Sequence, residues 1–506
     1  MKSRVEQLWL VVILAGFGFY VALVPLVPND FWWHLKAGEI IVTTGRIPNT
    51  NLFAWTLPRE QPYVYGAWLA EALFYSLYRL GGLALPMVAR TLLALAAFTL
   101  VALEARRRSA SWRIAALVLV PLCLMTLNNL LVRTQNWAWL PFVGFLLILT
   151  RYREGRLAPR WLLLLPLLLM FWVNVHGSWI LGPVLLGLTF LGEGVRYALR
   201  HPDALPRSRL LALPGVGVLC VLALLANPQG VGIVGYVYKM MTDAPSQTLI
   251  VEWQSPTPTG LANSAFYATV LLGFGALLYS RYRPPLTEAL TLAAFLWLAW
   301  SGQRYVIWFG MVAMPVLAQA LAEGWPRLRR GEGGRPHGIN TALALLMFLP
   351  VLAVQPWWVE RLPLPETYWT LVWRGREPGP LIGVETPLGA ADYLRAHPGG
   401  CLFNEMGYGS YLIWAVPEQG VFIDPRVELY PLEQWQDYIR ISQGVRYQAL
   451  LDKYGVTRIL LDRELQSGLA EVLRSDAAWE LEYQEARAEI WRKIGAFSPA
   501  CSVGRP

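Results

Sequence analysis

Asp30 and His34, an aspartate and a histidine one helical turn apart, could carry out acid–base chemistry. Both lie in the aromatic-rich stretch 28–34, which directly follows a long apolar segment. A carboxylate beside aromatic rings can have a raised pKa and act as a general base. The histidine would lie on the same helical face and could orient that base or share a metal ion with it. A structural interpretation also stands: Asn29 or Asp30 would cap a helix at 31–44, beside a belt of interfacial aromatic residues.

Other polar side chains are predicted at the ends of later apolar segments, on the same side as Asp30. They are Asn128, Asn129, Arg133, Asn174, His176, Asn227, Gln229, Glu252, Gln303, Arg304 and Tyr305. An arginine between two apolar runs, such as Arg304, needs an anionic partner, and a phosphate suits its planar guanidinium. The alternatives stay open: Arg304 could reach lipid headgroups, His176 could be a helix-end residue, and Arg133 and Glu252 could form structural ion pairs or contact headgroups.

The composition indicates a membrane protein. The chain has 506 residues, of which 55% are hydrophobic and only 15% are charged. A water-soluble chain of this length would carry nearer 25% charged residues. The composition therefore excludes a disordered chain, a nucleic-acid-binding arm and an ordinary soluble enzyme. It predicts a polytopic α-helical membrane protein with about eleven transmembrane helices.

The predicted spans are apolar runs separated by basic connections. They fall at about 8–27, 83–104, 114–132, 136–150, 161–173, 179–195, 210–226, 264–280, 286–302, 304–322 and 339–355. Eleven spans place six Lys/Arg clusters, with 20 of the 28 basic residues of 1–356, on one side of the membrane. The positive-inside rule then predicts a cytoplasmic N-terminus and an extracytoplasmic C-terminal region. Segment 68–80 is interpreted as an amphipathic helix on the outer surface, with Glu71 on its polar face.

Two domains are predicted from charge and pattern. Residues 1–356 form a transmembrane domain with long outside loops at 28–66 and 227–262, where function is expected. Residues 357–506 carry 15 basic and 20 acidic residues and form a soluble α/β domain with a mainly parallel sheet. Strands are predicted at 401–404, 420–424 and 456–462, and helices at 388–396, 432–442, 448–454 and 464–474.

Polar residues at the ends of these strands could bind a ligand or form turns and ion pairs. They are Asn404, Glu405, Tyr408, Asp424, Arg426 and Glu428. The sequence leaves open whether Cys401 and Cys501 pair.

Several segments together resemble C-type (GT-C) glycosyltransferases, with protein O-mannosyltransferases and the lipid A aminoarabinose transferase as relatives. The first loop carries the main likeness, in residues 30–38, 45–48, 61–63 and 68–71. Gln303-Arg304-Tyr305 followed by Pro315 resembles the late-helix segment of the superfamily. Residues 404–411 and 422–428 are similar to the C-terminal domain of uncharacterised bacterial members.

The resemblance implies roles for individual residues. Asp30 corresponds to the catalytic base of the first loop, and Arg304 to a phosphate-contacting position. Phe31 stands where the superfamily often has a second carboxylate, and we infer that His34 takes over part of that role. Gln61-Pro62-Tyr63 replaces the usual Lys-Pro-Pro segment, so donor-phosphate contacts from that segment are not expected.

The sequence thus predicts an inverting glycosyltransferase of a bacterial cytoplasmic membrane. Its donor would be a polyprenyl-phosphate sugar, its acceptor a glycan, lipid or protein, and its site would lie on the outer face among membrane lipids. No cofactor is required, although Asp30, His34, His176 and Glu252 could together hold a divalent metal. The other hypotheses are a lipid or polysaccharide transporter or flippase, and a non-catalytic subunit with a partner-binding outside domain. A transporter should show repeats and mid-membrane helix breaks, and no repeat is apparent.

Overall fold

The computed structural model describes residues 5–329, 337–356, 381–495 and 501. These residues form two compact units, each assembled from segments that are far apart in the sequence. Unit 1 comprises Met1–Val24, Ala84–Val237 and Ile250–Leu362; unit 2 comprises Pro25–Leu83, Tyr238–Leu249 and Pro363–Pro506. The first predicted outside loop therefore belongs to the same unit as the C-terminal region. The domain boundary predicted at residue 356 adjoins residues outside the described ranges and stays a prediction.

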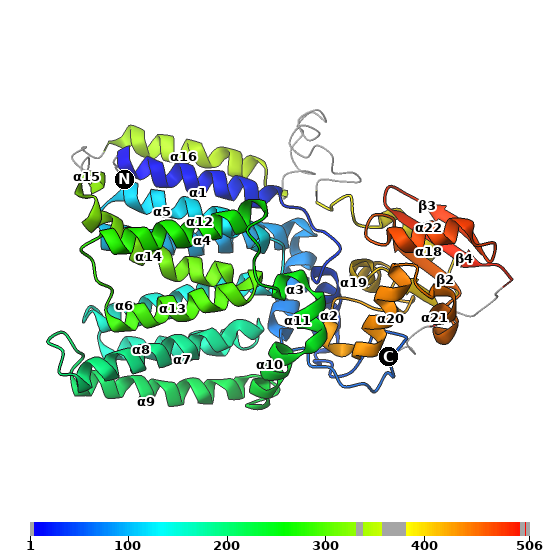
Figure 1. Ribbon diagram of the computed structural model, residues 1–506, viewed down its shortest axis with the longest axis horizontal. Coiled ribbons are helices and arrows are strands. Elements are labelled where there is room, and N and C mark those ends of the chain that lie inside the picture. The colour runs from blue at the N-terminus through cyan, green and yellow to red at the C-terminus, as the bar shows by residue number, and fades with distance from the viewer. Residues whose placement is uncertain (1–4, 330–336, 357–380, 496–500, 502–506) are drawn as a thin grey trace. The chain divides into compact units, whose positions relative to one another are not determined.

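Unit 1 is a bundle of helices whose axes run alongside one another (Figure 1). Its helices are α1 (Val5–Leu23), α4 (Ala84–Ser109), α5 (Trp112–Met125), α6 (Trp139–Arg153), α7 (Leu164–Trp172), α8 (Leu181–Ala198), α9 (Arg207–Ala223), α12 (Gly260–Tyr279), α13 (Leu286–Ser301), α14 (Val306–Gly324), α15 (Pro326–Arg329) and α16 (Gly338–Ala353). Helix α10 (Gly232–Thr242) begins in unit 1 and ends in unit 2.

Short 3-10 segments extend these helices or connect them. They are η1 (Leu127–Asn129), η2 (Thr134–Ala138), η3 (Pro159–Leu163), η4 (Gly177–Ile180), η5 (Leu224–Ala226), η6 (Val251–Trp253) and η7 (Gln303–Tyr305). Several of the polar residues predicted at the span ends lie in or next to these segments.

The apolar runs predicted from sequence all coincide with helices. Among the described residues, six helical segments are long and apolar enough to cross a membrane: Val5–Leu23, Ala84–Ser109, Gly177–Ala198, Arg207–Ala226, Gly260–Tyr279 and Gln303–Gly324. Shorter apolar helices occur at Trp112–Met125, Pro159–Trp172, Leu286–Ser301 and Gly338–Ala353. The protein is thus a polytopic helical membrane protein, while the count of eleven spans stays a prediction.

Helix α14 forms the core of unit 1. It packs against α4, α5 and α13, and most of its side chains are buried. A helix that is apolar on all sides is expected in such a position. Gly310 permits the close contact with α5, because a Cβ atom there would lie 2.6 Å from Leu122 Cδ1. Small residues are the usual means by which membrane helices approach closely.

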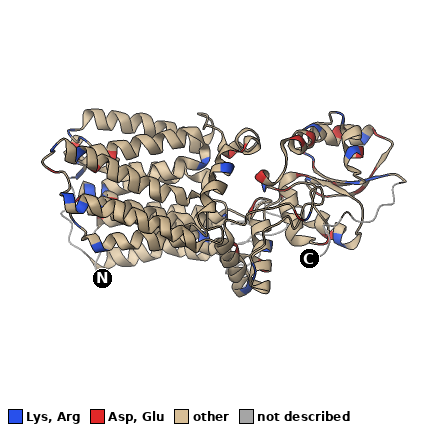
Figure 2. Ribbon diagram, turned by 90° about the horizontal axis from the view of Figure 1, so that it is seen from below, with Lys and Arg blue, Asp and Glu red and all other residues tan. Residues whose placement is uncertain are grey.

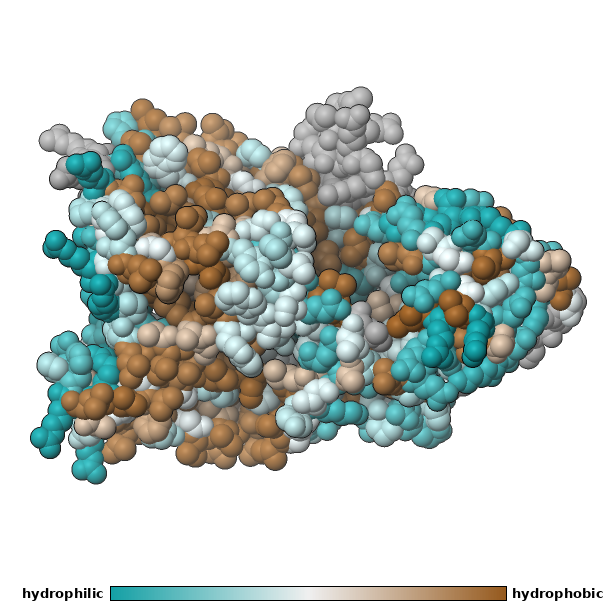
Figure 3. Space-filling view, in the orientation of Figure 1, coloured by the Kyte–Doolittle hydropathy of each residue, from teal (hydrophilic) through white to brown (hydrophobic). Residues whose placement is uncertain are grey.

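Apolar and basic residues occupy different parts of the surface of unit 1. Its visible face is largely apolar (Figure 3), and Lys and Arg gather at the end where α1 begins (Figure 2). At that end Arg107 binds Glu154 at 2.8 Å, so the connections after α4 and α6 lie together. This agrees with the prediction that their basic clusters share one side. Which side of the membrane that is stays a prediction.

Unit 2 combines the first loop with a small α/β fold. Its helical elements are α2 (Phe31–Thr44), α3 (Trp68–Gly81), α11 (Ala244–Leu249), α18 (Leu388–Ala396), α19 (Met406–Ala415), η9 (Val427–Leu429), α20 (Leu432–Ser442), α21 (Tyr447–Tyr454) and α22 (Ser467–Ser475). Its strands are β1 (Leu402–Asn404), β2 (Arg458–Asp462), β3 (Trp479–Gln484) and β4 (Ala488–Lys493). The helices predicted in the C-terminal region and two of its strands are confirmed.

The expectation of a mainly parallel sheet is wrong. The strand order is β1-β2-β4-β3; only β1 and β2 pair in parallel, whereas β4 pairs antiparallel with β2 and β3. The β3–β4 hairpin was not predicted, because its strands contain several charged residues and lack a clean apolar alternation. Segment 420–424 is not a strand of this sheet. The amide of Asn404 binds it instead, accepting from Phe422 N and donating to Ile423 O at 2.8 Å each.

Backbone bridges and a hydrogen bond connect the first loop and the residues just before it to the α/β fold. Leu26 and Ala54 form isolated parallel bridges with Ile382 and Val421. The Trp55 indole donates a hydrogen bond to Leu402 O at 3.0 Å. Cys401 and Cys501 form a disulfide, which settles the pairing that the sequence left open.

Candidate functional site

The predicted base, Asp30, lies at the start of α2. It occupies the N-cap position, but its side chain makes no capping hydrogen bond. Asn29 provides the side-chain acceptor, because its Oδ1 receives the N–H of Phe31 at 3.1 Å. The Asp30 carboxylate is therefore not used as a helix cap, and of the two residues that the structural interpretation offered for this role, Asn29 takes it. Asp30 is half-buried, between the buried aromatic residues of α2 and the preceding turn.

Ser410 of α19 holds the backbone on both sides of Asp30. Its hydroxyl accepts a hydrogen bond from Trp33 N at 3.1 Å and donates one to Asn29 O at 2.5 Å. Ser410 is fully buried. Helix α19 can approach this closely because it carries Gly407, where a Cβ atom would lie 2.5 Å from Pro28 O. The C-terminal region thereby fixes the backbone that presents Asp30.

His34 is bound by a buried carboxylate. Its Nδ1 lies 2.9 Å from Glu71 Oε1, and Glu71 is fully buried. The interpretation of Glu71 as a polar-face residue of a surface helix is therefore wrong. Helices α2 and α3 pack so tightly at Gly38 that a Cβ atom there would lie 2.0 Å from Glu71 O, and this contact buries the glutamate. A carboxylate on one ring nitrogen fixes the orientation of the histidine.

An aromatic cluster extends from His34 to Arg426. The rings of Trp33 and His34 lie 3.6 Å apart between centroids. The Arg426 guanidinium lies over the rings of Phe53, Tyr63 and Trp33 at 5.0, 5.2 and 5.9 Å. Such contacts are strongest where the cation is removed from water.

Arg426 is paired with Asp424 inside unit 2. Arg426 Nε and Nη2 donate to the Asp424 carboxylate at 2.8 and 2.6 Å, and Tyr430 donates to the same carboxylate at 2.5 Å. Burial opposes the charge of Arg426, but Asp424 outweighs it and raises the pKa of the guanidinium above its ordinary value. One Arg426 nitrogen, Nη1, and one Glu71 oxygen, Oε2, are buried without a hydrogen-bond partner in the described part of the chain.

The other strand-end residues of the C-terminal region are satisfied internally. Glu405 caps α19 by accepting from Tyr408 N at 2.8 Å. The Tyr408 hydroxyl donates to Asp462 at 2.9 Å, and Glu428 accepts from Tyr63 at 3.1 Å. Burial raises the pKa of Glu405, a rise that the backbone N–H groups of α19 only partly oppose. The sequence allowed these residues either to bind a ligand or to form turns and ion pairs, and the observed contacts favour turns and ion pairs.

Four of the residues predicted to bind substrate come together in unit 1. Arg133 forms an ion pair with Glu252. The Arg304 guanidinium stacks on Trp253 at 4.3 Å and lies 6.0 Å from the Tyr305 ring. Backbone hydrogen bonds join η6 and η7, with Gln303 N donating to Gln254 O at 3.0 Å. Segments more than 100 residues apart in the sequence thus form one polar cluster.

The cluster carries an excess of positive charge. Burial raises the pKa of Glu252, but Arg133 and then Arg304 outweigh this effect and hold the pKa below its ordinary value. Glu252 is therefore ionised at neutral pH and balances one of the two guanidinium groups. In the described ranges, no carboxylate lies within ion-pair distance of Arg304, whose face is supported by Trp253. A planar guanidinium held in this way suits a phosphate.

His176 and Asn174 lie at the turns next to this cluster, where η2 and η4 contact each other. Nδ1 of His176 accepts from Ser178 N at 3.0 Å and caps η4. The Asn174 side-chain oxygen accepts from Asn227 at 3.2 Å, which ties η5 to the end of α7. The side chains of His176 and Asn174 therefore stabilise the turns in which they lie. Nδ1 acts as an acceptor, so in neutral His176 the proton is on Nε2.

Metal binding finds no support in the geometry. Across the residues that the structure describes, no group of three or more His, Cys, Asp and Glu side chains could hold a metal ion. No firm cofactor is therefore assigned.

Sequence reasoning missed Ser410, Trp253 and the burial of Glu71. Trp253 directly follows Glu252, and an aromatic residue next to a predicted phosphate-binding region is the signal that could have found it. Ser410 and Trp33 are 377 residues apart, and no local pattern connects them.

Comparisons with known proteins agree with this architecture. No protein-family model matches the chain, and no curated protein matches it. Among solved structures, it is similar to the oligosaccharyltransferase AglB from Archaeoglobus fulgidus in complex with an inhibitory peptide and a dolichol-phosphate, with a TM-score of 0.52, 14% identity and coverage of 99% of this chain and 75% of that chain.

Two further structures show the same fold. ArnT from Cupriavidus metallidurans in the apo state gives a TM-score of 0.51 and 14% identity, covering 95% of this chain and 97% of that chain. Arabinofuranosyltransferase AftD from Mycobacteria gives a TM-score of 0.52 and 14% identity, covering 98% and 42%. The chain thus has the fold of these glycosyltransferases, which is the fold that the motif resemblance implied.

Proposed function

We propose that this protein is a membrane glycosyltransferase that uses a polyprenyl-phosphate sugar as donor. The observation that carries the proposal is the fold, which matches glycosyltransferases over 95–99% of the chain. One of those structures contains a dolichol-phosphate. The acceptor would be a glycan, lipid or protein.

In the proposed reaction, Asp30 takes the proton of an acceptor hydroxyl. The acceptor oxygen forms a bond to the anomeric carbon as the bond from that carbon to the phosphate oxygen breaks, with inversion. The polyprenyl phosphate leaves with the bonding electrons. Arg304 would stabilise the charge that develops on it, because a fixed cation is most effective where charge appears in the transition state.

The remaining site residues would support these two groups. His34, oriented by Glu71, would help to position the acceptor or Asp30. Tyr305 and Trp253 would hold Arg304, while Arg133 would be balanced by Glu252. His176 and Asn174 would shape the turns next to the phosphate site.

We further propose that the site lies on the extracytoplasmic side of a cytoplasmic membrane. The Cys401–Cys501 disulfide supports this placement of unit 2, because structural disulfides form mainly in oxidising compartments. The gathering of Lys and Arg at one end of unit 1 supports a cytoplasmic position for that end.

Donor turnover tests the proposal. Purified protein in lipid nanodiscs is incubated with radiolabelled polyprenyl-phosphate sugars and membranes, and release of the lipid phosphate is followed. We expect turnover by the wild type, loss in Asp30→Asn with donor binding retained, and weakened donor binding in Arg304→Met. Asp392→Asn is the matched control, because Asp392 is an exposed carboxylate of unit 2.

A different result would favour the other hypotheses. If no donor is turned over and Asp30→Asn still complements a deletion strain, the protein acts as a transporter or a non-catalytic subunit.

A further inference from the structure

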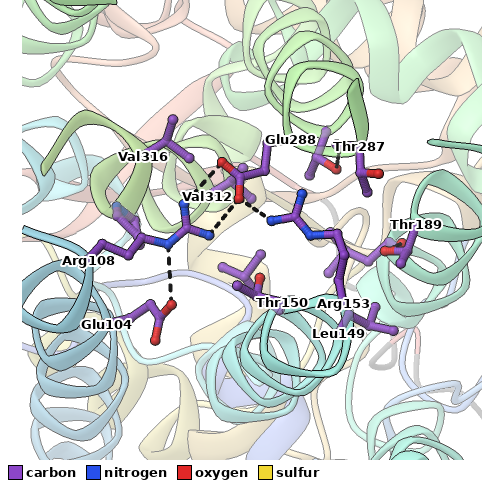
Figure 4. A pocket seen from close by; sticks show the side chains of 14 residues that line it. Glu104, Arg108, Leu149, Thr150, Arg153, Thr189, Thr287, Glu288, Val312 and Val316 are labelled. Carbon is purple, nitrogen blue, oxygen red and sulfur yellow. Dashed lines mark hydrogen bonds and ion pairs between the residues drawn. The ribbon is translucent and has the colours of Figure 1, made fainter. Parts of the chain in front are cut away.

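A second polar site lies inside unit 1, in a pocket among α4, α6, α8, α13 and α14. The pocket is small, with a cavity volume of about 40 Å³, and it is partly open to solvent. It lies at the end of the bundle where the basic connections after α4 and α6 meet. Arg108, Arg153, Glu104 and Glu288 line it together with threonines (Figure 4).

Each guanidinium nitrogen of Arg108 and each carboxylate oxygen of Glu288 already has a hydrogen-bond partner. Arg108 donates from Nη1 and Nη2 to Glu288 at 3.1 and 2.9 Å, and from Nε to Glu104 at 3.3 Å. Glu288 also accepts from Tyr282 at 2.6 Å and from Arg153 Nη2. These two residues therefore satisfy each other and are not the groups that most need a ligand.

Arg153 does have a donor to spare. Its side chain is only 7% exposed, and within the described residues its Nη1 is buried without a hydrogen-bond partner. An unmade hydrogen bond of a buried guanidinium is costly. Figure 4 shows the Arg153 guanidinium beside Glu288, with Thr150, Thr189 and Thr287 around it. Arg153 Nη1 is thus a charged hydrogen-bond donor in the pocket that has no acceptor among the described residues.

The charges around the pocket favour an anionic acceptor. Glu104 is shared by three guanidinium groups, those of Arg107, Arg108 and Arg151. Glu288 is shared by two, those of Arg108 and Arg153. Arg107 also contacts Glu154, so four arginines share three carboxylates, and an anion would reduce the repulsion among them.

The walls of the pocket indicate the kind of molecule that carries the anion. Leu149, Leu185, Val312, Pro315 and Val316 form its apolar part. Polar and apolar walls in one pocket match a molecule with a charged head and an apolar continuation.

We propose that this pocket binds a phosphate group, with Arg153 Nη1 as its charged donor and Thr150 as a neighbouring hydroxyl. It is separate from the Arg304 cluster and does not depend on the proposed glycosyl transfer. The phosphate belongs either to a lipid headgroup or to a free phosphate ion, and both present the same oxygen acceptors.

Binding is measured by native mass spectrometry and thermal unfolding on the full-length, delipidated protein. The probes are dioleoylphosphatidic acid, dioleoylglycerol, which lacks the phosphate, and inorganic phosphate. We expect one saturable equivalent of phosphatidic acid and no binding of dioleoylglycerol. Arg153→Gln should weaken binding roughly 10- to 100-fold, as expected for loss of a charged hydrogen bond.

Two further variants make the result interpretable. Thr150→Val keeps the ion pairs and should weaken binding less than Arg153→Gln, which covers the case in which Arg153→Gln fails to fold. Arg160→Gln is the matched control, because Arg160 is an exposed arginine outside the pocket. Competition by inorganic phosphate at similar concentration would identify a free ion as the ligand, whereas binding of the lipid alone would identify a headgroup.

Equal binding by the wild type, Arg153→Gln and Thr150→Val would overturn the proposal. So would an equal loss in Arg160→Gln, because it would show general attraction to basic loops. Absence of binding by every probe would leave the pocket as a structural ion-pair network only.

Discussion

The hydroxyl of Ser410 accepts the backbone N–H of Trp33 at 3.1 Å. The same hydroxyl donates to Asn29 O, so one side chain of the C-terminal region spans the backbone that carries Asp30. The proposed base therefore depends on a residue far along the chain for its placement. Removing that hydroxyl should lower the catalytic rate as well as the stability of the folded protein.

We predict that Ser410→Ala destabilises the protein by about 1–3 kcal/mol, because a buried backbone N–H loses its acceptor. The turnover number should fall while donor binding is retained, since Arg304 is untouched. Thermal unfolding and steady-state kinetics measure both effects. Ser475→Ala, at an exposed serine, is the control. Unchanged turnover in a destabilised Ser410→Ala would show that Ser410 supports folding alone.

Glu71→Gln tests whether the buried carboxylate positions His34. Glutamine keeps the shape and one hydrogen bond but removes the charge that favours a single ring orientation. We predict a drop in kcat of about 10- to 100-fold with little change in the donor KM. Glu39→Gln, at a half-buried glutamate of α2 that pairs with Lys36 and not with His34, should have no such effect. A rise in KM at constant kcat would contradict a positioning role.

Removing one partner of the Asp424–Arg426 pair should reduce stability far more than replacing both partners with apolar residues. Arg426→Met leaves Asp424 charged and buried, which costs about 3–5 kcal/mol, whereas Arg426→Met combined with Asp424→Leu should recover much of that loss. Denaturant unfolding of the single and double variants measures the difference. If the double variant is no more stable than Arg426→Met, the aromatic contacts of Arg426 matter more than its ion pair.

The Arg133–Glu252 pair should resist mild acid. The pKa of Glu252 in the folded protein lies below its ordinary value of 4.5. Its contribution to stability is therefore present above that value and is lost as the pH falls through the lower, folded-state pKa. The difference in melting temperature between wild type and Glu252→Gln should stay constant from about pH 8 to pH 5 and shrink below about pH 4.5. A difference that already closes near pH 6 would contradict the lowered pKa.

The sequence predicted the membrane-spanning part well because lipid demands long apolar helices. Every apolar run became a helix, and Arg133, Glu252, Arg304 and Tyr305 came together as expected from their common position at the span ends. The sheet was predicted less well. The order of strands depends on pairings between distant segments, and Asn404 holds 420–424 through its side chain, where a strand was expected.

Burial was the hardest property to predict. Glu71 stands on an amphipathic pattern that suits a polar face, yet Gly38 lets α2 approach it and cover it completely. The fold and the class of candidate residues thus followed from local pattern, whereas their actual partners depended on tertiary contacts.

The assembly of unit 2 from segments at both ends of the chain has a consequence for biosynthesis. More than 300 residues separate Leu83 from β1, so at 5–20 residues per second the ribosome needs roughly 15–65 s to supply the partner of the first loop. During that interval Trp32, Trp33 and their neighbours lack the surface that later covers them. A chain that stops early would expose this aromatic surface, and quality-control proteases or chaperones could recognise it.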